Sequence, residues 1–498
     1  MVSKLIRRSK GEAAQLSFML LISIATQIIS LYKSTVTASS FGASIEMDAY
    51  NFTNNITTFL FSFVASGVTT VVIPAYVQKK RKEDINAFLT LIYSVVFIGT
   101  ALLFVFRRPV FSLLTNRGVD FVQLASEMMI FTIVIQSVTA VLAITTAFYQ
   151  CENRFNTPKM VVFFCNVLTV ILLIIEKNLT IHRYLWILAI AAVINLSVDV
   201  FIAIKLGFRY TPSIRFQTKG FKKLLKTFIP CMFSTGVYKI HSLVDSLIAS
   251  TLGDGQLTIL SYANMIVNLV NTLIVNNLTV YAYPKLVSRI NGKDERNSQE
   301  QLWRYCILFQ LVVCLMIAGF VSVGKEGIAL LFLHGKFDAK SADMMFICCS
   351  LYILGQENNI VRDLIYRYFF AKADTKTTFA NSVFISIINL VLSIILVQFI
   401  GLYGIIIGTI VSGFISLIMI IIKLRKRYGL YNEFGMFVRE YIKNNCIMFV
   451  TIGTVYFIKH WFAFKFAILN IAVFGMLTVA IFAILTMLLK SVALKTEL

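Results

Sequence analysis

The feature that most constrains this chain is a series of uninterrupted apolar segments of helix length. Residues 131–148, 161–175 and 466–489 are examples, and none of them alternates between apolar and polar positions. A membrane-spanning helix needs ~20 mainly apolar residues, whereas a spanning strand needs ~10 with alternation. Only helices satisfy their own backbone hydrogen bonds within lipid. The pattern therefore predicts an all-α, polytopic membrane protein.

The composition supports lipid as the solvent for most of the chain. Of the 498 residues, 58% are hydrophobic and only 14% are charged, whereas soluble domains have about 45–50% and about 25%. We predict fourteen spans. Their cores are residues 16–38, 52–77, 85–106, 121–149, 159–175, 184–205, 228–252, 257–286, 303–323, 344–370, 379–399, 402–423, 441–458 and 462–489.

The basic residues alternate between the two sides of this arrangement. With the N-terminus in the cytoplasm, 33 Lys and Arg fall on the cytoplasmic side and 10 on the outer side. This asymmetry fits the positive-inside rule. It predicts a multi-pass protein of the inner or plasma membrane with both termini cytoplasmic. The first apolar run continues beyond Lys33 without a small-residue cleavage pattern, so we expect a retained first helix rather than a cleaved signal peptide. The net charge of +22 is explained by topology and anionic lipid headgroups, so no nucleic-acid partner is expected.

An internal repeat divides the chain. The segment from Ala38 to Gly42 parallels that from Ala249 to Gly253, and residues 73–77 parallel 283–287. Both copies enter the membrane from the cytoplasm, and parallel halves are a transporter architecture. We predict two pseudo-symmetric six-helix lobes, residues 1–215 and 216–430, followed by a C-terminal helix pair, 431–498.

Polar side chains follow the repeat. Four spans carry polar residues at helical spacing, which places them on one face of each helix. They are Ser23, Gln27, Ser30 and Ser34; Asn51, Asn55, Thr58 and Ser62; Ser234, Tyr238, His241 and Asp245; and Asn264, Asn268 and Asn271. Such residues either hydrogen-bond neighbouring helices together or line a wet cavity. Their placement on repeat-related helices favours the cavity.

Ionisable residues within the spans are further candidates, because a charge near the bilayer centre costs at least ~2.5–3.5 kcal/mol. They are Lys33, Lys239, Asp245 and the neighbours Arg362 and Asp363. Local ion pairing is the alternative for the last two and for Lys239 with Asp245. For Lys33, which has no carboxylate within a turn, the alternative is that the side chain snorkels to the outer interface. The eight cysteines and four histidines have no metal-ligand spacing, so no metal site is expected.

Three segments carry further motifs: Ser40–Ser44 with Asp48-Ala49-Tyr50, Phe63–Gly67, and the matching segment from Ala249 to Leu286. Together they resemble the MviN/MurJ lipid II flippases of the MOP exporter superfamily. The resemblance implies fourteen helices, two lobes and a central cationic cavity that opens alternately to either side. The implied substrate is a polyprenyl-pyrophosphate-linked saccharide, either lipid II or a surface-polysaccharide repeat unit.

The chain departs from this family at the cations of the cavity. Lys33 stands where the family has an arginine, whereas Gln27, Phe61 and Met265 stand where others are expected; Asp48 is retained. We predict that the cavity is lined by Lys33, Gln27, Ser30, Asp48, Asn51, Asn55, Lys239, His241, Asp245, Asn264, Asn268, Asn271 and Arg362.

Two other function classes stay open at this stage. A multidrug or cation antiporter would use buried carboxylates for its coupling ion, and a glycan-polymerising membrane enzyme would carry a large outer loop with paired carboxylates or His. Buried cations are at least as prominent here as buried carboxylates, and the outer loops are short. We therefore expect a flippase without catalytic residues or a cofactor, coupled to the membrane potential or to a monovalent cation. Membrane lipids are its expected surroundings, and a monomer its expected form.

Overall fold

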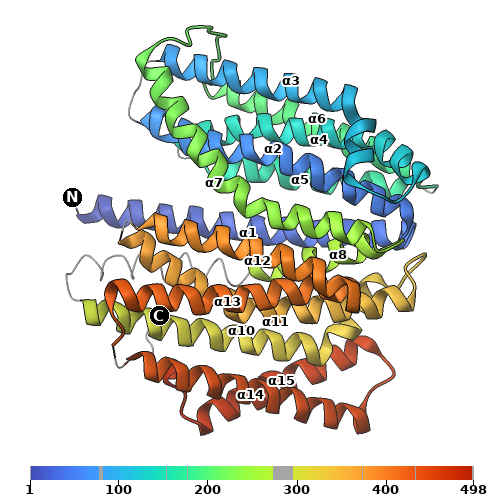
Figure 1. Cartoon of the computed structure of the whole chain (residues 1–498), viewed down its shortest axis with the longest axis vertical. Coiled ribbons are helices and arrows are strands. Elements are labelled where there is room, and N and C mark those ends of the chain that lie inside the picture. Colours follow the sequence, from blue (N-terminus) through green and yellow to red (C-terminus); the bar gives the residue numbers. More distant parts are fainter. Residues whose placement is uncertain are drawn as a thin grey trace. The chain divides into compact units, whose positions relative to one another are not determined.

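The computed structural model describes residues 2–77, 82–152, 154–176, 178–272, 295–372, 374–431 and 433–495. These residues contain fourteen α-helices and no β-strand (Figure 1). The helices are α1 (Val2–Phe41), α2 (Ile45–Val77), α3 (Lys82–Leu114), α4 (Val119–Cys151), α5 (Asn156–Ile175), α6 (Ile181–Lys205), α7 (Lys219–Ser250), α8 (Gln256–Val270), α10 (Glu295–Phe332), α11 (Ala339–Ala371), α12 (Thr375–Ile400), α13 (Leu402–Tyr428), α14 (Glu433–Phe462) and α15 (Ala467–Leu488).

Each predicted span overlaps one of these helices, which confirms the predicted all-α polytopic fold. Within the described residues, eight helices have the length and the apolar composition needed to cross a membrane. Residues 273–286 of the eighth predicted span, together with the repeat segment at 283–287, lie outside the described part of the chain.

The chain forms two compact units, Met1–Leu257 and Thr258–Leu498. In the first unit, α2 packs against α4 and α7, and α1 packs against α5 (Figure 1). In the second unit, α10 packs against α11, α14 and α15, and α12 packs against α13. The proposed pseudo-symmetric division at residues 215 and 430 remains a prediction.

In both copies of the repeat, a helix ends shortly before a glycine with positive φ. α1 ends at Phe41 and α7 at Ser250, and the glycines that follow, Gly42 and Gly253, have φ of 65° and 118°. Positive φ strains any residue with a Cβ and suits glycine. The repeated Ala–Gly segment therefore marks a helix end in both copies.

The predicted break between the spans at 379–399 and 402–423 is also present. Gly401 has φ of 56° and separates α12 from α13. A Cβ on Gly404 would lie 2.5 Å from the backbone of Leu396. The absence of a side chain at Gly404 allows the two antiparallel helices to approach within backbone contact.

Candidate functional site

The polar face of α1 contains the first group of candidate residues. Gln27, Ser30 and Lys33 follow one another at helical spacing, and all three side chains are half-buried. The Lys33 ammonium has no hydrogen bond or ion pair with any other residue that the structure describes. A half-buried ammonium without a carboxylate partner is suited to binding an anionic ligand.

A second cation lies against the same helix. The Lys159 ammonium on α5 donates a hydrogen bond of 2.8 Å to the hydroxyl of Ser23 on α1. Lys159 was not among the residues predicted to line the cavity. Its position at the start of an apolar span was the available signal, but the packing of α1 against α5 is a tertiary contact that periodicity does not reveal.

The polar face of α2 bonds to neighbouring helices in the first unit. The Asn55 amide donates to the hydroxyl of Ser246 on α7 at 3.0 Å. Gln136 on α4 donates to Asn54 at 2.9 Å. Asn51 on the same face is half-buried. Asn55 thus joins two of the four predicted polar helices directly.

Of the predicted cavity residues on α7, the structure describes the side chain of Asp245 but not those of the other two. Asp245 is buried, with 7% of its surface exposed, beside the equally buried Ser246. The side chains of Lys239 and His241 lie outside the described part of the structure, so the predicted pairing of Lys239 with Asp245 remains a prediction.

In the second unit the candidate asparagines follow α8 and its end. The Asn264 amide donates to the Tyr352 hydroxyl on α11 at 3.3 Å. Asn268 is exposed, and Asn271 has a buried side-chain oxygen without a hydrogen-bond partner among the described residues. Among the described residues, Asn264 is the one of these three with a hydrogen bond to another helix, and the contact of Asn268 and Asn271 with a ligand stays a prediction.

Arg362 lies on α11 with its neighbour Asp363. Their side chains form an ion pair of 3.1 Å, and the Arg362 guanidinium lies 5.7 Å from the centre of the Tyr366 ring. The local pairing considered from the sequence is therefore present. The Asp363 carboxylate is half-exposed and the Arg362 side chain largely covered.

Asp48 is completely buried at the start of α2. Its carboxylate accepts a hydrogen bond of 2.9 Å from Arg117, in the turn between α3 and α4, and one of 2.7 Å from the amide of Gly255. Arg117 also pairs with Asp254. This cluster ties the turn between α7 and α8 to the start of α2. Its residues lie far apart in the sequence, and only Asp48 was predicted as functional.

A buried polar network in the second unit was also missed. Gln310 on α10 and Asn445 on α14 donate to the Glu357 carboxylate on α11 at 2.8 and 2.5 Å, and Asn444 donates to Gln310 at 2.7 Å. Glu357 falls inside the predicted span 344–370, so its charge was the available signal. These donors satisfy the buried carboxylate.

The structure thus brings Asn55 together with the segment of Asp245 in one unit and Asn264 together with α11 in the other. No cluster of His, Cys, Asp and Glu suited to a metal ion occurs among the described residues. Within each unit, these contacts are hydrogen bonds between helices, and the cavity lined by the predicted residues stays a prediction.

A protein-family model matches the chain over most of its length. The model of the family described as "Lipid II flippase MurJ" matches residues 37–478. The chain is 22% identical over 430 residues to the probable lipid II flippase MurJ of Borreliella burgdorferi, covering 82% of this chain and 83% of that protein. A match of 22% to the Thermotoga maritima protein covers 81% and 83%. The 25% match to the Burkholderia cenocepacia lipid II flippase spans 50% of this chain and only 47% of that relative.

Solved structures show the same fold. A lipid II flippase MurJ in an inward closed conformation has a TM-score of 0.80 at 20% identity, covering 94% of this chain and 99% of that one. An inward-facing multidrug resistance MATE transporter of the MOP superfamily has a TM-score of 0.66 at 14% identity, covering 82% and 98%. At these identities the likeness concerns the fold alone.

Proposed function

This chain belongs to the lipid II flippase MurJ family, and we propose on that premise that it carries a polyprenyl-pyrophosphate-linked saccharide from the cytoplasmic to the outer leaflet. The observation that carries the proposal is the family match, which extends over residues 37–478. Members of this family are transporters, so neither covalent chemistry nor a cofactor is part of the proposed activity. Lipid II is the substrate that the family's description names, and a surface-polysaccharide unit has the same anionic linkage.

Lys33 gives this activity a candidate contact with the pyrophosphate. Its ammonium is half-buried and has no partner among the described residues. Charge-assisted hydrogen bonds to phosphate are about twice as strong as neutral ones. In a partly dry site they offset the cost of removing the anion from water. The half-buried Gln27 and Ser30 on the same face have side chains that suit the sugar hydroxyls or the outer phosphate.

A cluster of contacts supports a movable closure of the transport path. It consists of Asp48, Arg117 and the turn at Gly255. The buried Asp48 carboxylate accepts a hydrogen bond from the Gly255 amide. In the orientation predicted from the loop charges, this end of the helices lies outside. Breaking these contacts would release the turn between α7 and α8. We propose that this cluster closes the outer side of the transport path and opens when the substrate leaves.

The coupling of transport is also part of the proposal. The inside-negative membrane potential acts on a cationic empty site at about 2.3 kcal/mol per charge per 100 mV. A monovalent cation is the alternative driving partner. A multidrug antiporter is less well supported, because the similarity to MATE transporters concerns the fold.

The experiment is transport by the purified full chain in proteoliposomes. Labelled lipid II and a labelled polyprenyl-pyrophosphate-linked oligosaccharide are each placed in the inner leaflet. Their arrival outside is measured with an impermeant enzyme that modifies the sugar. The proposal predicts chain-dependent arrival of at least one of the two. Arrival equal to that in protein-free vesicles for both would contradict it, and the faster of the two identifies the saccharide.

A further inference from the structure

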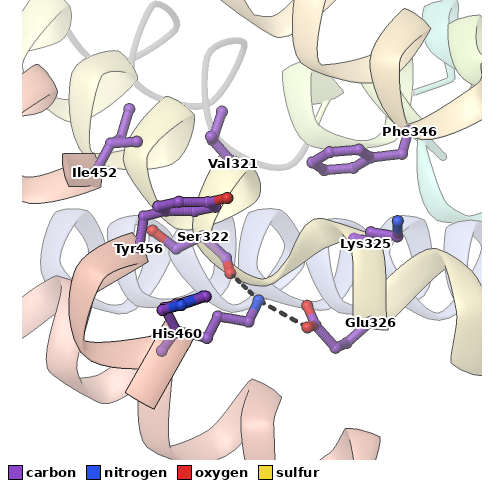
Figure 2. Close-up of a pocket in the computed structure, with 9 residues that line it drawn as sticks. Val321, Ser322, Lys325, Glu326, Phe346, Ile452, Tyr456 and His460 are labelled. Carbon is purple, nitrogen blue, oxygen red and sulfur yellow. Dashed lines mark hydrogen bonds and ion pairs between the residues drawn. The ribbon is translucent and has the colours of Figure 1, made fainter. Parts of the chain in front are cut away.

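A pocket separate from the residues discussed above lies within the second unit, where α10, α11 and α14 meet. Its volume is about 270 Å³, slightly below the roughly 300–1,000 Å³ of sites for drug-sized ligands. Figure 2 shows Tyr456 and His460 of α14 on one side and Phe346 and Lys325 on the other. The pocket therefore suits a compact group rather than a large ligand.

The polar part of this pocket consists of an incompletely bonded carboxylate and hydroxyl. Lys459 donates to one oxygen of Glu326 at 2.7 Å and to the backbone oxygen of Ser322 at 2.7 Å (Figure 2). The second Glu326 oxygen, Oε2, and the Ser322 hydroxyl are buried and have no hydrogen-bond partner among the described residues. Ser322 as a whole is only 7% exposed. Buried polar atoms in native proteins are normally paired, so these two point to a bound hydrogen-bond donor.

The charges of the pocket indicate what kind of donor fits. The unpaired oxygen of Glu326 and the aromatic ring of Tyr456 belong to residues that line the same pocket. A carboxylate and an aromatic ring each attract an organic ammonium group. Lys325 lies at the rim, 61% exposed, and its ion pair with Asp343 uses one of its three donors. An anion alone would leave the unpaired oxygen of Glu326 and the Ser322 hydroxyl without a hydrogen-bond donor. A zwitterion, with its ammonium inside and its phosphate at the rim, satisfies both groups.

The surroundings indicate that such a ligand arrives from the membrane. Near the pocket, α14 presents Phe449, Tyr456, Phe457 and Trp461, all of them at least 60% exposed. Tryptophan favours the level of the lipid headgroups, and Trp461 adjoins His460 of the pocket. The pocket thus lies at headgroup depth with an apolar flank for acyl chains.

We propose that this pocket binds the headgroup of a zwitterionic aminophospholipid such as phosphatidylethanolamine. The primary ammonium donates to Glu326 Oε2 and to the Ser322 hydroxyl, and the phosphate accepts from Lys325. The loop charge distribution places the pocket in the outer leaflet. The binding does not depend on transport and is measured without it.

The test is lipid binding to the purified full chain by native mass spectrometry. Phosphatidylethanolamine, phosphatidylcholine and phosphatidylglycerol with identical acyl chains are titrated separately. Phosphatidylcholine carries a methylated ammonium that cannot donate hydrogen bonds, and phosphatidylglycerol has no ammonium. We expect phosphatidylethanolamine to bind at least about ten-fold more tightly than either, the equivalent of one charge-assisted hydrogen bond.

Two variants locate this preference in the pocket. Glu326→Gln should abolish it, and Ser322→Ala should reduce it while leaving the Lys459–Glu326 ion pair in place. Glu300→Gln is the matched control, because Glu300 also forms an ion pair with a basic residue on α10 but lies at the other end of the helix. Should Glu326→Gln fail to fold, Ser322→Ala decides the matter alone. Equal binding of the three lipids, a preference for phosphatidylglycerol, or a preference that survives in every folded pocket variant would overturn the proposal.

Discussion

The amide of Gly255 donates a hydrogen bond of 2.7 Å to the buried carboxylate of Asp48. Gly255 has φ of +79°, and a Cβ at this position would lie 2.5 Å from the backbone oxygen of Ala43. Positive φ and the close approach both require glycine. The turn between α7 and α8 is thereby held against the turn between α1 and α2.

Substitution of this glycine should disturb the turn by steric overlap. Gly255→Ala is expected to shift the conformational equilibrium towards an opened turn, because the added methyl group cannot coexist with the Ala43 carbonyl. Gly253→Ala is the matched control: Gly253 also has positive φ, but its Cβ would meet nothing within 4 Å. Labelling of a cysteine introduced at Ser250, which is completely buried at the end of α7, measures the opening. Equal labelling of both variants would show that backbone strain, rather than the overlap, controls the turn.

Removal of the Asp48 charge should destabilise the first unit. Asp48→Asn leaves the largely covered Arg117 without its buried partner, and breaking such a buried pair costs about 3–5 kcal/mol. Glu83→Gln removes a carboxylate from an exposed pair with Arg215 and should cost no more than about 1 kcal/mol. Thermal unfolding in detergent compares the two. A smaller loss for Asp48→Asn than for Glu83→Gln would refute the structural role of the cluster.

The asparagines should separate into structural and substrate-facing residues. Asn55→Leu is expected to lower stability, because Asn55 bonds to Ser246 on α7. Asn268→Leu should leave stability unchanged and reduce transport, because Asn268 is exposed. Thermal unfolding and vesicle transport are measured on the same preparations. If Asn268→Leu transports as the parent does, the polar face of α8 does not contact substrate.

The topology gives a further expectation. A cysteine at Gly335, in the turn between α10 and α11, should react with an impermeant thiol reagent added to intact cells. A cysteine at Gln217, in the exposed segment between α6 and α7, should react only after the cells are opened. Labelling of the unsubstituted chain provides the background. The reverse pattern would invert the proposed orientation.

The helices were predictable because each apolar run is an independent signal. Every predicted span meets one helix, and even the closely spaced pair around Gly401 was separated correctly. Membrane helices satisfy their backbone within the segment itself, so their positions depend little on tertiary contacts.

The contacts of the candidate site were not predictable in this way. Periodicity places Asn55 on a polar face, but only packing reveals Ser246 as its partner. Arg117 and Glu357 acquire their roles from helices that are distant in sequence. The role of Lys33 stays a prediction. It was proposed from its charge deep within an apolar run and from the family position that it occupies, neither of which requires knowledge of its neighbours.

The measurement that tests the account most directly is transport by variants of Lys33. The parent and the Lys33→Gln, Lys33→Arg and Lys376→Gln variants are reconstituted, and outward appearance of the lipid-linked saccharide is followed. Lys376 is an exposed lysine at the start of α12 and serves as the charge-matched control. Hydrogen bonds to charged groups contribute roughly 1.5–3 kcal/mol each, which corresponds to a loss of about ten-fold or more. We predict that Lys33→Gln loses transport, that Lys33→Arg retains part of it, and that Lys376→Gln behaves as the parent. Transport by Lys33→Gln at the rate of the parent would contradict the account.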